Sequence, residues 1–182
     1  MGHSAPRVLD EYLVVAAQTG DREAWNMLAK RWHRKLVAHA WRLTGDTEFA
    51  HEAAQAGWVE IVRNLHRLDD SRAFTAWAYR IASRRCARVI GEAVKIRTIG
   101  EALADMPIAS EPDAERAVEG QQLRGAIAAL PPDQRAAIAL FYLEEMGVAE
   151  IAVALNTPVG TIKTRLMHAR LKLRKTVEGN AK

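Results

Sequence analysis

Residues 148–175 form the stretch VAEIAVALNTPVGTIKTRLMHARLKLRK, which decides the fold class of this chain. The stretch predicts a short apolar helix, a tight turn and a longer basic amphipathic helix. In the longer helix, apolar residues recur at helical spacing, so one face is expected to pack against a core. The positions of this apolar stripe are Ile162, Leu166, Ala169 and Leu173. Residues 161–175 also contain six Lys or Arg and no acidic residue.

The residues between the two helices favour a sharp connection. Asn156 and Gly160 tolerate the backbone angles of a tight turn, and Pro158 cannot continue the first helix. Thr161 is the expected N-cap of the second helix, because its hydroxyl can accept from a free backbone N–H. Together these features predict a helix-turn-helix.

The side of the second helix opposite the apolar stripe is the candidate DNA surface. We expect the base-facing side chains to be Lys163, Thr164, Met167 and His168, flanked by Thr161, Arg165 and Arg170. A helix that buries one face and offers cations and small hydrogen-bonding groups on the other suits the major groove of DNA. The alternative is a solvated basic helix on a small bundle, since charge runs are common on wet faces.

Composition limits the class of protein further. The 182 residues are 49% hydrophobic and 26% charged, with a net charge of +4, which favours a polyanionic partner. The single cysteine, Cys86, excludes an internal disulfide and a thiolate zinc cluster, and we expect it to be inert packing. No apolar run approaches the roughly 20 residues of a membrane span and no signal peptide is evident, so we expect a cytoplasmic protein without membrane insertion.

Helical periodicity dominates the whole chain, so the predicted fold class is all-α, with two small helical domains joined by a flexible linker. In the first domain, helices are expected to end at Gly20 and Gly45, to span residues 47–65, and to run from Phe74 to about Ile90. From Gly91 to Pro112 no stripe persists. The expected divisions are a disordered N-terminus (1–8), a first domain (9–92), a linker (93–112) and a second domain (113–178).

The last helix of the first domain is a second candidate nucleic-acid surface. It carries the cations Arg80, Arg84, Arg85 and Arg88. The polar loop before it consists of Asp69, Asp70, Ser71 and Arg72. Nearby aromatic residues at 74, 77 and 79 would suit unstacked single-stranded bases. Aromatic residues at helical spacing are also typical of a core, and the sequence alone leaves both possibilities open.

Several segments together resemble the extracytoplasmic-function (ECF) group of bacterial RNA polymerase sigma factors. AAQTGDREAWNMLAKRW resembles the start of that family's first domain, RLTGDTEFAHEAAQAGW its polymerase-binding stretch, and RLDDSRAFTAWAYRIA its promoter −10 segment. LPPDQRAAIALFYLEEMGVAEIAVALNTPVGTIKTRLMHARLKLRK is similar to its −35-binding domain almost throughout. The resemblance covers most of residues 9–175 apart from the linker.

The resemblance implies a partner for each surface. Glu52 and Gln55 would contact the β′ clamp helices of core RNA polymerase, and the second domain would dock on the β flap. The loop at 69–72 would capture the unpaired −10 strand, while the four arginines of the following helix would hold phosphates. The helix from Thr161 would enter the −35 major groove of promoter DNA. An anti-sigma factor is a further implied partner, and no cofactor or metal is implied.

Three other functions are alternatives to a sigma factor: a zinc protease, a regulator that works without polymerase, and a sigma mimic. His51-Glu52-Ala53-Ala54-Gln55 is a near match to the HExxH zinc-protease signature, but Gln is a poor zinc ligand and no third ligand is evident, so we expect no enzyme. A helix-turn-helix regulator that works without polymerase would need a receiver or ligand-binding domain, and the first block lacks the strand pattern for one. A sigma mimic that sequesters an anti-sigma factor would not need a basic recognition helix.

Overall fold

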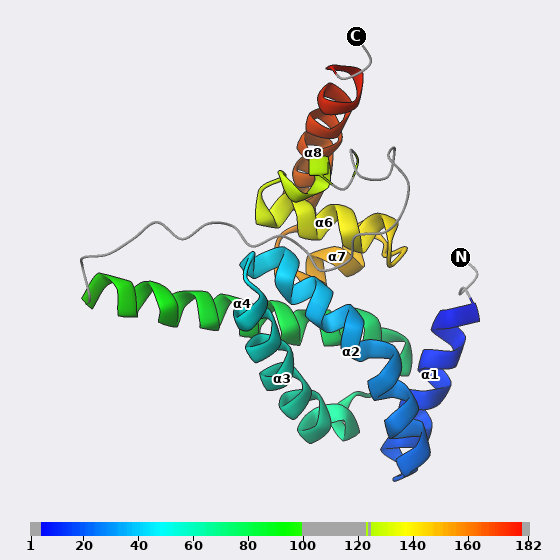
Figure 1. The fold of residues 1–182 in the computed structure, drawn as a ribbon. Helices are drawn as coiled ribbons and strands as arrows, with labels where there is room; N and C mark the ends of the chain where they lie inside the picture. The colour runs from blue at the N-terminus through cyan, green and yellow to red at the C-terminus, as the bar shows by residue number, and fades with distance from the viewer. Residues whose placement is uncertain (1–4, 100–122, 124, 180–182) are drawn as a thin grey trace.

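The structure is a computed structural model that describes residues 5–99, 123 and 125–179. Within those residues all regular secondary structure is helical and no strand is present, as the sequence predicts. Figure 1 shows the first-domain helices below and the second-domain helices above them.

Four helices and two short 3₁₀ turns make up the first domain: α1 (Ala5–Gln18), α2 (Arg22–Thr44), α3 (Thr47–Asn64), η1 (Leu65–Arg67), η2 (Ser71–Ala73) and α4 (Phe74–Ile99). Local chemistry sets the ends of α2 and α3. Asp21 accepts from the backbone N–H groups of Glu23 and Ala24 at the start of α2, and Asp46 caps α3 in the same way. Gly45 closes α2 with a φ of 71°, a left-handed conformation that glycine adopts without steric cost.

The core of the first domain lies where α1, α2 and α4 meet. Trp32 of α2 packs edge-on against Phe74 of α4, with ring centroids 5.0 Å apart, and Tyr79 lies 5.4 Å from the same indole. All three side chains are buried, which decides the alternative left open by the sequence in favour of core packing for Phe74 and Tyr79. Trp77 is only partly buried.

The second domain contains α6 (Pro132–Tyr142), α7 (Val148–Ala154) and α8 (Val159–Gly179), preceded by a helical stretch at residues 125–128. The predicted stripe is confirmed, because Ile162, Leu166 and Ala169 are buried and Leu173 packs against the same cluster. Asn156 takes a φ of 49° in the turn between α7 and α8, as its position in the predicted helix-turn-helix requires.

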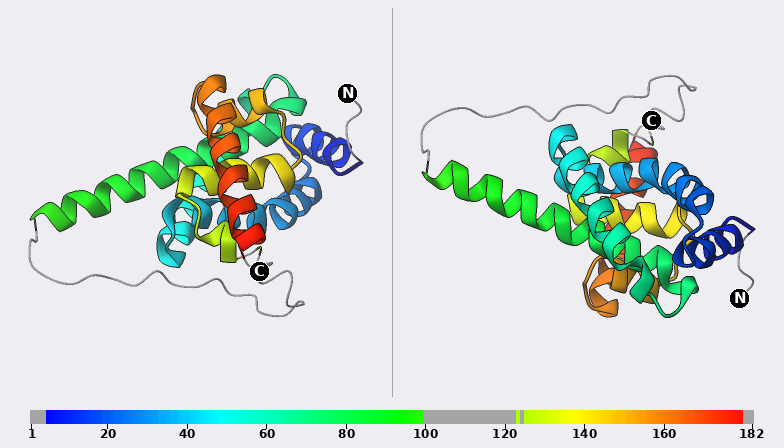
Figure 2. Two further views of the ribbon diagram at one scale, coloured as in Figure 1. Left: turned by 90° about the horizontal axis from the view of Figure 1, so that it is seen from above. Right: turned by 90° about the horizontal axis from the view of Figure 1, so that it is seen from below.

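The two domains pack directly against each other. One hydrophobic cluster includes Leu36 and Tyr79 from the first domain together with Leu140, Met146 and Ile151 from the second. Helix α7 lies against α4, and α6 lies against α2 (Figure 2). The part of the chain between residues 100 and 122, which contains most of the predicted linker, lies outside the described residues.

Three local predictions are wrong. The N-terminus is helical from Ala5 rather than disordered to residue 8, because Arg31 of α2 holds α1 through Asp10 (2.7 Å) and the Pro6 carbonyl (3.2 Å). Helix α4 continues to Ile99, nine residues beyond the expected end. A glycine inside a helix costs only about 1 kcal/mol, so the half-buried Gly91 does not stop it.

The third error concerns the start of α8. This helix begins at Val159, so Gly160 and Thr161 lie inside its first turn and Thr161 is not its N-cap. The backbone N–H of Ile162 donates to the Pro158 carbonyl, which places Pro158 at the helix entrance. The fixed φ of proline is already close to a helical value, so it supplies the starting geometry that we had assigned to Thr161.

In the part of the chain that the structure describes, no helix combines the length and the apolar character that a membrane crossing requires.

Candidate nucleic-acid interfaces

The outer face of α8 presents the four predicted base-facing side chains to solvent. Lys163, Thr164, Met167 and His168 are all exposed, with Met167 at 50%. The Thr164 hydroxyl donates to the Gly160 carbonyl at 3.1 Å and keeps its lone pairs and methyl group on the surface. The set therefore offers an ammonium, a hydroxyl, a thioether and an imidazole on one side of a helix whose other side is fixed in a core. Such a helix can enter a major groove and contact base edges.

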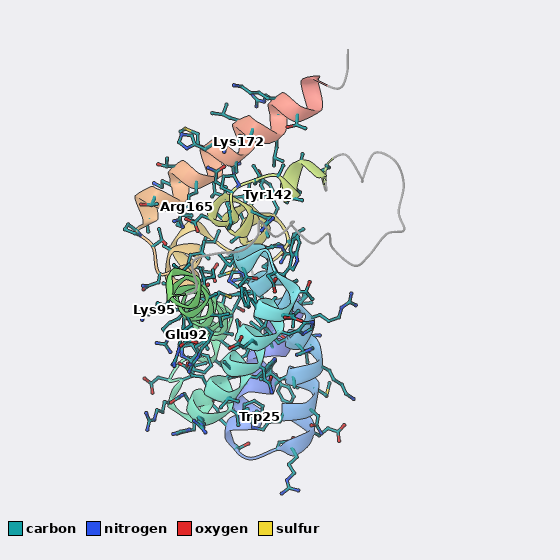
Figure 3. The ribbon with its side chains drawn as sticks, turned by 60° about the vertical axis from the view of Figure 1, so that its left-hand side comes forward. Trp25, Glu92, Lys95, Tyr142, Arg165 and Lys172 are labelled. Carbon is teal, nitrogen blue, oxygen red and sulfur yellow. The ribbon has the colours of Figure 1, made fainter. Side chains whose placement is uncertain are left out.

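The two predicted flanking cations, Arg165 and Arg170, contact α6 and the turn. Arg165 donates to Asp133 Oδ2 of α6 at 2.6 Å and to the Thr157 hydroxyl at 3.3 Å. Arg170 donates to the Tyr142 hydroxyl at 3.0 Å, and its guanidinium lies 5.1 Å from the Phe141 ring centroid. Figure 3 shows the positions of Arg165 on α8 and Tyr142 on α6. Both side chains therefore bind α8 to α6 and the turn. Thr161 is exposed on the first turn of α8.

The loop before α4 is polar and largely open. Asp69, Asp70 and Arg72 are exposed and Ser71 is half-buried. Asp70 accepts from the backbone N–H of Arg72 at 2.9 Å and also binds the guanidinium of the same residue at 2.9 Å. This local pair holds the loop in a defined shape directly before α4, where a splayed base could be held.

The four arginines of α4 are engaged within the chain. Arg84 and Arg85 both bind the carboxylate of Glu60 on α3, Arg85 through Nη2 at 2.6 Å and Nε at 3.0 Å. Arg88 binds Glu92 one turn along α4 at 2.8 Å. Arg80 donates to Asn156 Oδ1 in the helix-turn-helix at 3.4 Å. Partial burial works to raise the pKa of the Glu60 carboxyl, but the hydrogen bonds and charges of Arg84 and Arg85 outweigh it and lower that pKa below its usual value.

The outer face of α3 extends the predicted polymerase contact. Glu52 and Gln55 are exposed, as expected for a contact surface. One and two turns further along the same face, Val59 and Val62 are 48% and 58% exposed. Neither valine was among the predicted contact residues, although two apolar residues on the helix face of Glu52 and Gln55 are a usable signal for a docking surface.

An apolar groove of about 650 Å³ lies between the end of α2 and the helices of the second domain. Trp41 of α2 forms one wall, and Ile138, Tyr142 and Leu173 contribute the apolar surface of α6 and α8. Because most of its lining residues are apolar, the groove suits an apolar segment of a partner.

Metal or thiol chemistry finds little support in the described residues. No group of three or more His, Cys, Asp and Glu side chains among them could hold a metal ion. Burial raises the pKa of the Cys86 thiol to about 12, so this side chain stays protonated and unreactive.

The fold and these surfaces define a class: a two-domain helical DNA-binding protein with a helix-turn-helix in its second domain. Comparison with known families is more specific. Residues 28–93 match the family described as Sigma-70 region 2, and residues 120–173 match Sigma-70, region 4.

Curated relatives agree along nearly the whole chain. The ECF RNA polymerase sigma factor SigW of Bacillus subtilis is 30% identical over 168 residues, which cover 86% of this chain and 90% of that relative. The ECF RNA polymerase sigma-E factor of Escherichia coli is 30% identical over 183 residues, covering 90% of this chain and 92% of the relative. The chain belongs to the ECF group of sigma-70 factors, which bind core RNA polymerase and direct transcription initiation at promoters.

Two solved structures share the fold. The sigma factor RpoE of Bartonella quintana, in complex with the anti-sigma factor NepR, has a TM-score of 0.71 at 19% identity and covers 85% of this chain and 96% of its own. CnrH, in complex with the cytosolic domain of CnrY, has a TM-score of 0.63 at 20% identity and covers 94% and 98%.

Proposed function

We propose that this sigma factor selects its promoters chiefly through the outer face of α8, and that it carries out no bond chemistry itself. Lys163, Thr164, Met167 and His168 contact base edges in the −35 major groove. Their joint exposure on a helix fixed by a buried stripe is the observation that carries this proposal. Arg165 and Arg170 position the helix from behind rather than contact bases.

The −10 strand binds at the loop of residues 69–72 and along α4. The loop holds a flipped base, and the arginines of α4 contact phosphates, a role that is largely independent of base sequence. Because Glu60 holds Arg84 and Arg85, a phosphate must compete with this carboxylate to reach them.

Core polymerase binds at two surfaces. The α3 face of Glu52, Gln55, Val59 and Val62 contacts the β′ clamp helices, since it combines polar groups with exposed apolar area. The apolar groove beside Trp41 receives an apolar segment of the β flap. The chain acts in the cytoplasm, where the polymerase is, and an anti-sigma factor is a further partner, as NepR is for RpoE of Bartonella quintana.

Co-elution with purified bacterial core polymerase on a sizing column at near-physiological salt tests the proposal. We expect a stoichiometric complex that transcribes from a subset of a random promoter library. Val59→Asp should abolish co-elution, because it places a charge on the apolar part of the α3 face. Val153→Asp is the matched control, since Val153 is 47% exposed on α7 away from that face.

A folded wild-type chain that does not co-elute would contradict the proposal and favour a sigma mimic or a polymerase-independent regulator. Equal loss of binding in both valine variants would contradict the assignment of the α3 face.

A further inference from the structure

A side chain of α1 binds the backbone directly before the loop of residues 69–72. We infer that Gln18 is a positioning residue for that loop: its amide fixes the turn through which the chain leaves α3, and so sets how the loop meets the −10 strand. Gln18 acts through the loop and does not need to touch DNA. The inference rests on the −10 role proposed for the loop.

The amide nitrogen of Gln18 binds two carbonyls of one turn. Its Nε2 donates to the Leu65 carbonyl at 2.9 Å and to the Leu68 carbonyl at 2.8 Å. A side-chain amide nitrogen carries two protons, so these two bonds use both of them. Both distances are those of well-formed N–H···O bonds, and the Gln18 side chain is half-buried. Gln18 therefore ties two points of the chain, 47 and 50 residues further on, to the end of α1.

The two carbonyls lie where the helix ends and the loop begins. Leu65 opens the 3₁₀ turn after α3, and its carbonyl also accepts from the Leu68 N–H at 3.0 Å. Leu68 is extended, with a φ of −81° and a ψ of 103°, and its carbonyl is the last backbone group before Asp69. Carbonyls at the end of a helix lack intrahelical donors, so a side chain that reaches them satisfies them. Gln18 thus fixes the direction in which the chain enters the loop.

The other contacts of the loop are local or lie at its far end. The pair of Asp70 and Arg72 holds the shape of the loop within itself. At the far end, Phe74 opens α4 and is 1% exposed. The near end is held by the buried Leu65 side chain and by Gln18, and α1 lies against both η1 and η2.

A second side chain on α1 acts on the same loop. Glu11 lies two turns before Gln18, so the two residues share one face of the helix. The hydrogen bond and the charge of Asp70 raise the pKa of the Arg72 guanidinium, and the charge of Glu11 adds to this in the same direction. The face of α1 that carries Gln18 is therefore close enough to the loop for its charges to be felt there.

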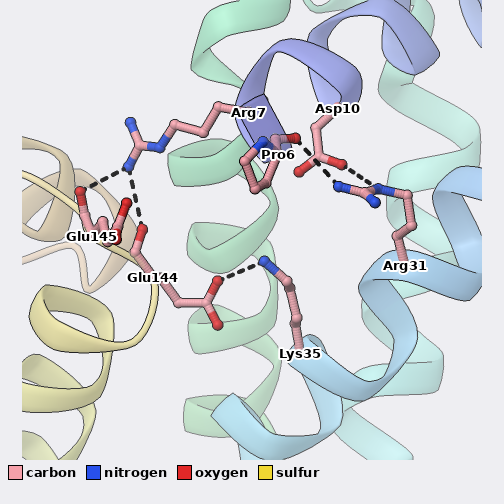
Figure 4. Close-up of polar contacts among 7 residues, drawn as sticks. All are labelled: Pro6, Arg7, Asp10, Arg31, Lys35, Glu144 and Glu145. Carbon is pink, nitrogen blue, oxygen red and sulfur yellow. Dashed lines mark hydrogen bonds and ion pairs between the residues drawn. The ribbon is translucent and has the colours of Figure 1, made fainter. Parts of the chain in front are cut away.

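Helix α1 is fixed at both ends, so it is a firm support for the turn. Near its start, Arg31 of α2 donates to Asp10 Oδ1 at 2.7 Å (Figure 4). At its end, Gly20 has a φ of 95°, a left-handed conformation that glycine adopts without steric cost, and the N–H of the next residue donates back into the last turn of α1 at 3.1 Å. The chain therefore turns toward α2 directly after Gln18, which keeps the amide beside η1.

The test compares base discrimination by reconstituted holoenzymes. Core polymerase is loaded with the full chain, and affinities are measured for a fluorescent single-stranded DNA with a −10 element selected by the wild-type holoenzyme, and for strands with one −10 base changed at a time. Gln18→Glu keeps the size of the side chain but replaces both donors by an acceptor. Gln18→Met removes the donors without adding charge, and Gln18→Lys keeps donors on an arm of similar length. Asn26→Asp, at an exposed position on α2, is the matched control for the change from amide to carboxylate.

We expect Gln18→Glu and Gln18→Met to lower the discrimination between selected and changed strands about tenfold at the base that the loop contacts, which is the worth of one base contact. Gln18→Lys should restore most of this discrimination, and Asn26→Asp should discriminate like wild type. Discrimination among duplexes that differ in the −35 element should stay unchanged in all four variants. Melting temperatures of the free variants show whether each one is folded.

A merely structural role for Gln18 would weaken the binding of every strand alike and leave the discrimination unchanged. That result in folded Gln18→Met would overturn the inference, and so would a Gln18→Lys variant that discriminates no better than Gln18→Met. Asp70→Ala, within the loop, separates this failure from a failure of the proposed function. If Asp70→Ala also leaves the discrimination at every −10 base unchanged, the loop contacts no base and its −10 assignment is wrong.

Discussion

Helices α8 and α4 both carry cations assigned to promoter DNA, but they hold them in different states. On α8, Lys163 and His168 are exposed and make no ion pair among the described residues. On α4, Arg84 and Arg85 are bound by Glu60, and Arg88 is bound by Glu92. The comparison teaches that a count of arginines does not measure attraction for a phosphate, because intramolecular carboxylates already neutralise part of the charge.

The difference in ion pairing matches the different tasks proposed for α8 and α4. A helix that contacts bases must present its donors without rearrangement, whereas a helix that receives a strand only after melting can keep its cations paired until then. Counterion release measures phosphate contacts, so α8 should contribute the steeper part of the salt dependence of promoter binding. Four predictions follow, from the largest expected effect to the smallest, and three of them test this division.

The largest effect is expected at a base-facing cation. Lys163→Ala should weaken binding to promoters that carry the preferred −35 base by about 1–3 kcal/mol, the range for a good base contact, and leave other promoters little changed. Competition among library promoters, sequenced before and after transcription, measures this preference. Lys172→Ala on the same helix is the control and should weaken all promoters alike. A uniform loss with Lys163→Ala would contradict its assignment to a base.

The free energy of unfolding is expected to depend on pH through a histidine buried against α4. His39 of α2 is buried, its Nε2 lies 2.9 Å from Ser83 Oγ of α4, and burial together with the charge of Arg42 lowers its pKa from 6.5 to about 3. Below pH 6.5 the imidazole of His39 therefore takes up a proton in the unfolded chain but stays neutral in the folded chain. The contribution of neutral His39 to the free energy of unfolding is therefore fully present above pH 6.5. It is lost as the pH falls toward 3, by up to about 1.4 kcal/mol per pH unit.

Denaturant unfolding at pH 5.0 to 7.0 measures this slope. His39→Gln should flatten it, because the group that titrates only in the unfolded chain is gone. His33→Gln, at an exposed position on the same helix, should keep the wild-type slope. Equal slopes in all three proteins would show that His39 does not supply the pH dependence.

A smaller effect is expected when the cations of α4 are released. Glu60→Gln should free Arg84 and Arg85 for phosphates, raise affinity for the −10 strand several-fold, and steepen its salt dependence by up to about 0.7 per phosphate gained. Glu92→Gln frees only Arg88 and should give a smaller change of the same sign. Titrations of labelled strand at four salt concentrations decide the matter, and a weaker salt dependence in Glu60→Gln would contradict the competition.

The sequence predicts those features that depend on neighbours along the chain. The buried stripe of α8 and the Gly45 end of α2 are both confirmed, because helical periodicity and the chemistry of helix ends act over a few residues. The start of α8 shows the limit of such signals. Pro158 and Thr161 are both compatible with a helix N-terminus, and the sequence does not choose between them.

Surface pairing was not predicted, for a physical reason. Glu60 lies 25 residues before Arg85, on another helix, and hydrophobic periodicity states which faces turn inward rather than which exposed charges meet. The packing of the two domains against each other is a similar case. Arg135 follows Arg42 by 93 residues, and their contact depends on how two complete domains pack.

Arg165 is a paired cation on α8, so it tests whether ion pairing, rather than the helix that carries the cation, separates the two roles. Its side chain is 22% exposed against Asp133, so a double-mutant cycle of Arg165→Ala and Asp133→Ala should give a coupling of roughly 0.2–1 kcal/mol in the free energy of unfolding. Each single variant should weaken all −35 elements alike, since both loosen the seat of α8 on α6 without removing a base contact. If Arg165→Ala instead changed promoter preference and Asp133→Ala did not, Arg165 would contact a base, and pairing within the chain would no longer separate positioning cations from base-contacting ones.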